Sequence, residues 1–163
     1  MKSFITVCVS VCAVIFAGVA IARADGEKDS AAAVAAAADR KAIQGTWRVV
    51  AQEMRGGPGP GDPREQRMVF SGDSFKLVDG DKVLLRGTFT LDASRSPRAM
   101  EMKVSEGAGG DREAPVHGIY ELRGDDLAWC AAEPGSAAGP QRFETRGTTN
   151  ALIRMKRAAG GKE

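Results

Sequence analysis

The chain has 163 residues, enough for one domain with a single hydrophobic core and too few for two. Hydrophobic residues make up 43% of it and charged residues 27%, a balance that excludes intrinsic disorder. Removing Lys2 and Arg23, which belong to a predicted export signal, from the 23 basic residues leaves 21, equal to the 21 acidic residues. A chain without net charge is not expected to bind nucleic acid, which requires a positive excess.

The N-terminal segment has the order of an export signal. Lys2 supplies the positive start, residues 4–21 are an uncharged apolar run, and Ala22-Arg23-Ala24 is a small-x-small cleavage site. We therefore expect residues 1–24 to be removed, leaving a mature chain that begins at Asp25 in the periplasm or outside the cell. The apolar run is just long enough to cross a membrane. The cleavage site and the polar sequence after it favour removal, so no stable membrane anchor is expected.

Export also limits the cysteine chemistry. Cys8 and Cys12 leave with the signal, and the residues around Cys12 fit a lipid-acceptor motif poorly. Cys130 then stands alone, so the mature chain can form no internal disulfide. We interpret Cys130 as a small buried hydrophobic residue on a strand, with a reactive thiol or an intermolecular disulfide as the alternative.

Residues 25–44 are predicted to form a helical tether. Residues 31–38 are alanine apart from Val34, Ser30 is a good N-cap, and Gly45 can end the helix. Because no apolar stripe runs along this segment, we expect only its last turn to dock on the rest of the protein, through Ile43. A helix that binds a partner protein is the alternative, but the segment has no large side chains for that role.

After Gly45 the hydrophobic period changes to two, which predicts strands. On the first strand, Trp47, Val49 and Ala51 share one face. A long later strand places Val83 and Leu85 on one face, together with Phe89 and Leu91. The eight predicted strands cover residues 46–54, 68–70, 75–77, 83–91, 100–104, 116–122, 127–129 and 151–157.

Turns and loops separate these strands. Residues 55–64 form a loop rich in glycine and proline that cannot be a central strand, and Asp79-Gly80 is a strong hairpin signal. Residues 106–112 are a flexible glycine loop. Residues 133–140 break the alternation, and Phe143 beyond them is a candidate buried anchor.

Eight short strands in hairpin order, each with one apolar face, indicate an antiparallel meander. A meander of this length normally closes, because closure removes its two unpaired edges. The predicted fold is therefore all-β. It is an eight-stranded up-and-down barrel over residues 45–157, with the alanine-rich helix before it and a flexible tail, residues 158–163, after it.

The predicted interior supports two interpretations. An apolar period-two face is what any sheet needs, so the inward residues can simply be core. An eight-stranded barrel can also hold one small ligand, and Tyr120 and Trp129 would then be polar handles in an apolar pocket. The candidate ligand-binding residues are Val49, Phe70, Phe75, Leu85, Phe89, Met100, Met102, Tyr120 and Trp129. Trp47, Leu77, Ile153 and Met155 complete the inward set.

Other chemistry lacks the residues it would need. His117 and Cys130 cannot complete a zinc site. A serine triad would have to use His117 as its base, but the sequence has no G-x-S-x-G motif to supply the nucleophile. Asp79-Gly80-Asp81 reads as a hairpin turn, because the further ligands of a calcium loop are missing. Residues 107–110 are glycine-rich but have no phosphate-binding lysine. We therefore expect no metal, no cofactor and no enzymatic activity.

Several segments carry a family resemblance. Gly45-Thr46-Trp47 is similar to the G-x-W opening of lipocalin-like (calycin) barrels, in which the tryptophan closes the barrel and packs against an arginine of the last strand. Alternation places Arg157 on the face where it can make that contact, so Gly45, Trp47 and Arg157 are the expected closure residues.

The order IQGTWRVV (43–50), VFSGDSF (69–75), GIYEL (118–122) and KR (156–157) resembles a small secreted lipocalin-like family found in many copies in planctomycete bacteria. The resemblance covers residues 39–157. It implies the fold and the compartment and carries no catalytic residues. The glycine–proline loop at residues 56–61 and the alanine tract are departures from the family pattern.

Two functions are compatible with these features. The first is an exported module that binds a small apolar or amphipathic ligand inside the barrel. The second is a structural or protein-interaction domain with a filled core that acts through its loops at the cell envelope. The volume left free in the interior distinguishes them.

Overall fold

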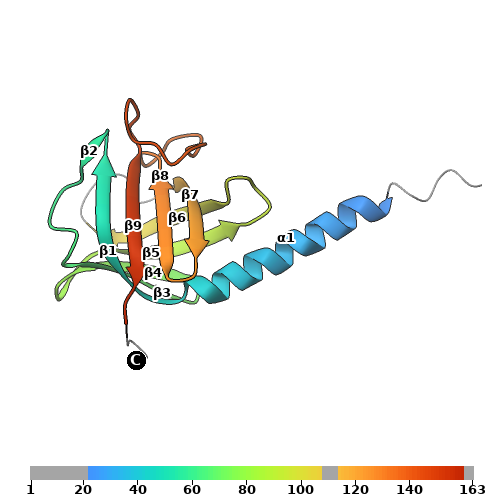
Figure 1. Cartoon of the computed structure of the whole chain (residues 1–163), viewed down its shortest axis with the longest axis horizontal. Coiled ribbons are helices and arrows are strands. Elements are labelled where there is room, and N and C mark those ends of the chain that lie inside the picture. The colour runs from blue at the N-terminus through green and yellow to red at the C-terminus, as the bar shows by residue number, and fades with distance from the viewer. Residues whose placement is uncertain (1–21, 108–113, 160–163) are drawn as a thin grey trace, which may run out of the picture.

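The computed structural model describes residues 22–107 and 114–159 of the chain. One helix, α1 (Ala22–Ile43), precedes the sheet (Figure 1). The predicted export signal lies almost entirely outside the described residues, as do most of the glycine loop and the end of the tail. The strands are β1 (Gly45–Met54), β2 (Gly57–Pro58), β3 (Gln66–Ser71), β4 (Ser74–Asp79), β5 (Lys82–Asp92), β6 (Ala99–Gly107), β7 (Val116–Arg123), β8 (Asp126–Ala131) and β9 (Ala151–Arg157).

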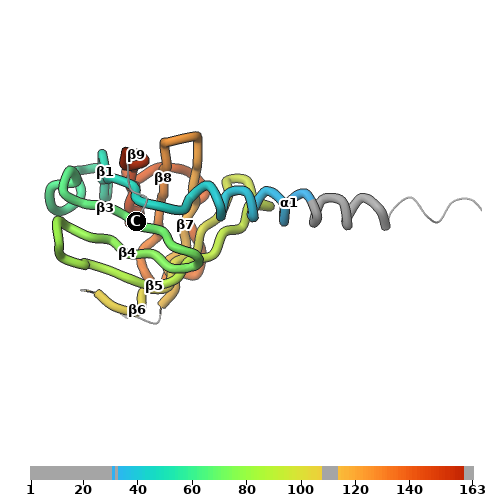
Figure 2. The backbone as a smooth tube through the Cα atoms, turned by 90° about the horizontal axis from the view of Figure 1, so that it is seen from below, coloured from blue at the N-terminus to red at the C-terminus, as the bar shows by residue number. Residues whose placement is uncertain are grey.

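The strands form a closed antiparallel barrel. From β3 to β9 each strand pairs with the next one in the chain, and β1 pairs with both β3 and β9. Eight strands therefore surround one interior, which confirms the predicted fold (Figure 2). β2 lies outside this ring. It is a two-residue strand that pairs with the end of β1 inside the predicted Gly/Pro loop.

The helix starts earlier than the sequence indicated. It begins at Ala22, so the expected cleavage site after Ala24 lies in its first turn and Ser30 is not its N-cap. Alanine, arginine, glutamate and lysine, which are good helix formers, supply five of the eight residues before Ser30, and the helix continues through the weaker formers Asp25, Gly26 and Asp29. Val34 is 67% exposed where α1 projects from the barrel (Figure 1).

The last turn of α1 is attached to the barrel through several contacts. Ile43 is fully buried in the core, as predicted. Asp39 accepts hydrogen bonds from Arg98 at 2.7 Å and from the Tyr120 hydroxyl at 2.6 Å. The Gln44 side chain makes two hydrogen bonds to the backbone of Gly72, at 2.7 and 3.1 Å. The contacts hold only this end of the helix.

Two bulges change which side chains face inward. The β1–β9 register shifts between Val49 and Ala51, so Gln52, opposite Ile153, takes the inward position predicted for Ala51. The β4–β5 register shifts between Leu77 and Val78, and Val83 consequently turns outward and is 39% exposed. The predicted inward positions of Ala51 and Val83 are therefore wrong. An extra residue inverts the alternation beyond it.

The segment between β8 and β9 packs on the outside of the barrel. Ile119, Cys130 and Leu152 face outward from β7, β8 and β9 and form a second small core, with Phe143 packed against them. Phe143 is the anchor that the sequence predicted. Cys130 is fully buried, as predicted, and this burial raises the pKa of its thiol. Within the described residues, no helix is long and apolar enough to span a membrane.

Candidate ligand-binding site

One end of the barrel is sealed. At this closed end, where β1 begins and β9 ends, the Arg157 guanidinium lies 4.2 Å from the centre of the Trp47 ring. Arg157 also donates hydrogen bonds to the carbonyls of Ala42 at 2.6 Å and Gln44 at 2.9 Å, the last turn of α1. The Trp47 Nε1–H donates to the Ile43 carbonyl at 2.7 Å. The Trp47–Arg157 contact that the resemblance to lipocalin-like barrels implied is present.

Tyr120 contributes to this closure. Its hydroxyl donates to Asp39, whose carboxylate also pairs with Arg98. Burial and the Asp39 carboxylate together raise the pKa of Tyr120. Because the hydroxyl already has a partner, Tyr120 is not a free polar handle for a ligand.

The closed half of the interior is filled by side chains. Phe70 and Phe89 pack edge to face with ring centres 5.0 Å apart. All seven candidate residues of this half are at most 4% exposed and belong to one core cluster. Such packing leaves each of them in contact with its neighbours, as a core requires. The seven are Val49, Phe70, Phe75, Phe89, Met100, Met102 and Tyr120.

We call the opposite end, where β1 finishes, the open half; its inward apolar side chains are only partly buried, as Leu91 and Leu122 are near the closed end. Leu77, Leu85 and Val104 point inward and pack against the core, yet each remains partly exposed. Inward apolar side chains that solvent still reaches form an apolar wall inside the mouth of the barrel. Of the candidate residues, Leu85 lies in this wall.

Trp129 lies in the middle of β8, between Tyr120 and Ile153 on the neighbouring strands. It is 8% exposed, and its Nε1–H has no hydrogen-bond partner among the described residues. The indole lies over Gly118 on the neighbouring strand, where an added Cβ would come within 2.5 Å of Nε1. Since Gly118 faces inward between Val116 and Tyr120, the unpaired N–H belongs to the barrel interior. Of the two predicted polar handles, Trp129 is the one that stays available.

A second unpaired polar atom lies nearer the rim. Gln52 Oε1 is buried without a partner among the described residues. Ile153 separates Gln52 from Trp129 in the sheet, pairing with both. Gln52 was not among the predicted inward residues because the bulge reverses its orientation. A polar residue directly after an apolar alternation is the only signal that could have indicated it.

The glycine–proline loop lies against this rim. The Gly59 amide donates to the Gln52 carbonyl at 2.8 Å, and a Cβ on Gly59 would approach the Gln52 Cγ to 2.5 Å. A Cβ on Gly61 would be 3.1 Å from Nε2 of the buried Gln66. The loop follows the two glutamines closely because these positions are glycine.

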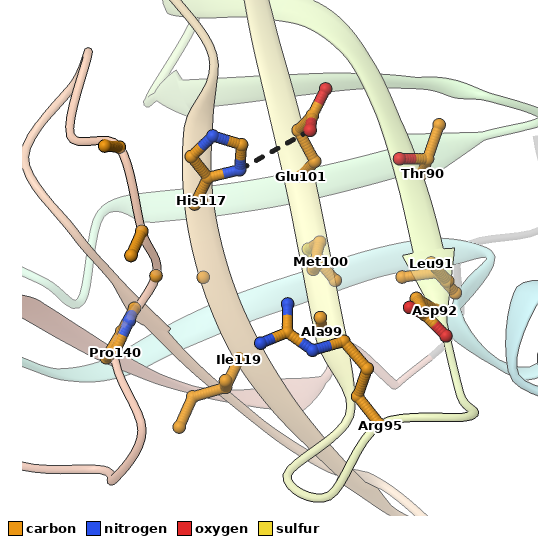
Figure 3. A pocket seen from close by; sticks show the side chains of 14 residues that line it. Thr90, Leu91, Asp92, Arg95, Ala99, Met100, Glu101, His117, Ile119 and Pro140 are labelled. Atoms are coloured by element: carbon orange, nitrogen blue, oxygen red, sulfur yellow. Dashed lines mark ion pairs between the residues drawn. The ribbon is translucent and has the colours of Figure 1, made fainter.

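An outer groove of about 370 Å³ crosses β5, β6 and β7 (Figure 3). In it, His117 Nδ1 lies 3.4 Å from Glu101 Oε2, and Arg95 extends across the floor. Thr90 pairs with Glu101, which pairs in turn with His117. The carboxylate therefore stands between the hydroxyl and the imidazole, whereas a catalytic triad needs the imidazole in the middle. Among the described residues no cluster could hold a metal ion.

These features define a lipocalin-like barrel, closed at one end by tryptophan and arginine and lined by an apolar wall at the other. The chain matches no family model, no curated protein and no solved structure in the comparisons made. The fold is thus defined by its topology and its closure.

Proposed function

We propose that this chain is a non-enzymatic, exported lipocalin-like protein that binds a small amphipathic molecule in the open half of its barrel. The observation that carries the proposal is the unpaired Nε1–H of Trp129 in a barrel interior that also contains the partly buried wall of Leu77, Leu85 and Val104. A buried N–H without a partner costs about 1–3 kcal/mol, and a ligand oxygen would remove that cost. The apolar wall would bury the remainder of the ligand.

The experiment uses the indole protons as reporters. The mature chain has two tryptophans, and only Trp47 has a bonded Nε1–H. On titration of nitrogen-15-labelled protein with hexanol, we expect the Trp129 indole N–H resonance to move downfield while the Trp47 resonance stays fixed. Trp129→Phe assigns the signal and should weaken binding. Trp47→Phe makes the same chemical change at the closed end and should leave hexanol affinity unchanged.

A molecule that co-purifies with the exported protein would identify the natural ligand class by native mass spectrometry. If the Trp129 resonance stays fixed with hexanol and the native mass equals that of the bare chain, the ligand-binding proposal fails.

The second candidate function is a structural or protein-interaction domain. The filled closed half of the interior and the outer groove beside His117 favour it. A protein partner would then protect residues around Glu101 and Pro140 from hydrogen exchange and leave the Trp129 indole resonance unchanged.

A further inference from the structure

The surroundings of the Trp129 N–H are apolar. None of the residues in its row of the sheet is charged: Tyr120 pairs with Trp129 and already donates its hydroxyl to Asp39, and the neutral Gln52 amide lies beyond Ile153. Trp129 pairs with Tyr120, and Ile153 flanks it on the other side. The remaining inward side chains around it are Val49, Met102, Val116, Ala131 and Met155, all of them buried.

Charge enters the open half only at its rim. Asp79 pairs with the inward Gln66 at the end of β4, and Lys82 is opposite Asp79 at the start of β5. These two oppositely charged residues flank the turn that joins β4 to β5, at the rim beyond the apolar wall. Among the described inward residues between this hairpin and the Arg157–Trp47 closure, none is a cation.

A single N–H in apolar surroundings favours a neutral ligand group over a charged one. A carboxylate placed there would lose its hydration and gain one hydrogen bond, and burying an ion on those terms is strongly unfavourable. A carbonyl or hydroxyl oxygen needs only one donor and gives up far less hydration. The indole N–H cannot accept a hydrogen bond, so an ammonium group gains nothing from it.

We infer that the ligand presents a neutral oxygen acceptor, a ketone, amide or alcohol, to the Trp129 Nε1–H, and that fatty-acid anions are excluded. This inference rests on the proposed function and specifies the chemistry of the same site. Gln52 Oε1, nearer the rim, adds an acceptor, so a second polar group on the ligand should be a donor.

The test compares four six-carbon compounds at neutral pH on the full mature chain: methyl butyl ketone, hexanol, hexanoate and hexane. Dissociation constants come from calorimetry, and the Trp129 indole resonance reports the hydrogen bond. We expect the ketone and the alcohol to bind about fivefold more tightly than hexane, the value of one hydrogen bond. Hexanoate should bind at least about tenfold more weakly than hexanol.

The Trp129→Phe variant isolates the N–H. It should bind the ketone and hexane equally, while Trp47→Phe keeps the preference of the unmodified protein. Equal binding of hexanoate and hexanol by the unmodified protein would overturn the inference and leave the proposed pocket intact. Binding of none of the four compounds would overturn both. The ligand series on the unmodified protein decides the matter even if a variant does not fold.

Discussion

Arg157 stacks on Trp47 and, with the same guanidinium, donates hydrogen bonds to two carbonyls at the end of α1. One side chain thus connects the first strand, the last strand and the C-terminus of the helix. A positive group is favourable at a helix C-terminus, where unpaired carbonyls accumulate. The closure is therefore electrostatic as well as steric.

This arrangement predicts strong coupling between the two residues. Trp47→Ala should lower the free energy of unfolding by about 3–5 kcal/mol, the range for a buried large aromatic residue. Arg157→Ala should cost about 1–3 kcal/mol. The double variant should lose less than the sum, because the cation–π contact is removed only once. Urea denaturation of all four proteins measures the cycle, and strictly additive losses would contradict it.

Tyr120 predicts a loss of stability in alkali. Its pKa is raised in the folded protein, so above the ordinary tyrosine pKa of about 10 the unfolded chain releases a proton that the folded chain keeps. The free energy of unfolding should then fall with rising pH, by about 1.4 kcal/mol per pH unit.

Tyr120→Phe should remove this part of the slope, and the remaining slope belongs to Cys130 and the other titrating groups. Because the chain has one tyrosine, tyrosinate absorbance follows the same group directly. An identical slope in the two proteins, or a normal titration of Tyr120, would contradict both the burial of its hydroxyl and the Asp39 contact.

The packing of the glycine–proline loop on Gln52 predicts that alanine substitutions at two of its glycines differ in their effect on stability. Gly59→Ala places a Cβ against the Gln52 side chain and should cost about 1–3 kcal/mol while changing hexanol affinity. Gly57→Ala, two residues away, meets only the Met54 carbonyl at 3.8 Å and should be tolerated within about 0.5 kcal/mol. Thermal unfolding and calorimetric titration compare them. Equal effects would mean that the loop does not pack on Gln52.

Enlarging interior residues should separate the two halves of the barrel. Val49→Phe and Met102→Phe overfill the packed half and should each cost about 1–3 kcal/mol. Leu85→Phe changes the partly buried wall, so it should keep the urea midpoint and lose hexanol binding. If Leu85→Phe is as destabilising as the other two, the open half is also filled core.

The proposed export makes a prediction about mass. The protein recovered from outside the cytoplasm should have the intact mass of residues 25–163, with Asp25 at its N-terminus. A full-length chain that fractionates with membranes would contradict this. Ala24→Leu should block processing, because the cleavage position requires a small residue, whereas Val34→Leu changes an exposed position of α1 and should leave processing unaffected.

The sequence predicted the barrel because alternation and turn signals are local. Trp47, Phe70 and Trp129 could be assigned to the interior from period-two patterns alone, whereas the Trp47–Arg157 contact was implied by the resemblance to lipocalin-like barrels and only allowed by the alternation. The bulges could not be predicted, since an extra residue leaves no mark in composition, and Gln52 was therefore missed. The sequence also did not show that the Tyr120 hydroxyl is already bonded, because its partner Asp39 lies far away in sequence.

The pairing of β1 with β9 has a consequence for how the chain acquires its structure. More than a hundred residues separate Trp47 from its neighbour Arg157, so the ring cannot close while synthesis or translocation is still delivering the chain. Until then β1 and β8 each expose an unpaired edge, and the open half of the interior does not yet exist. The incomplete chain is thus open to aggregation until its last strand is available.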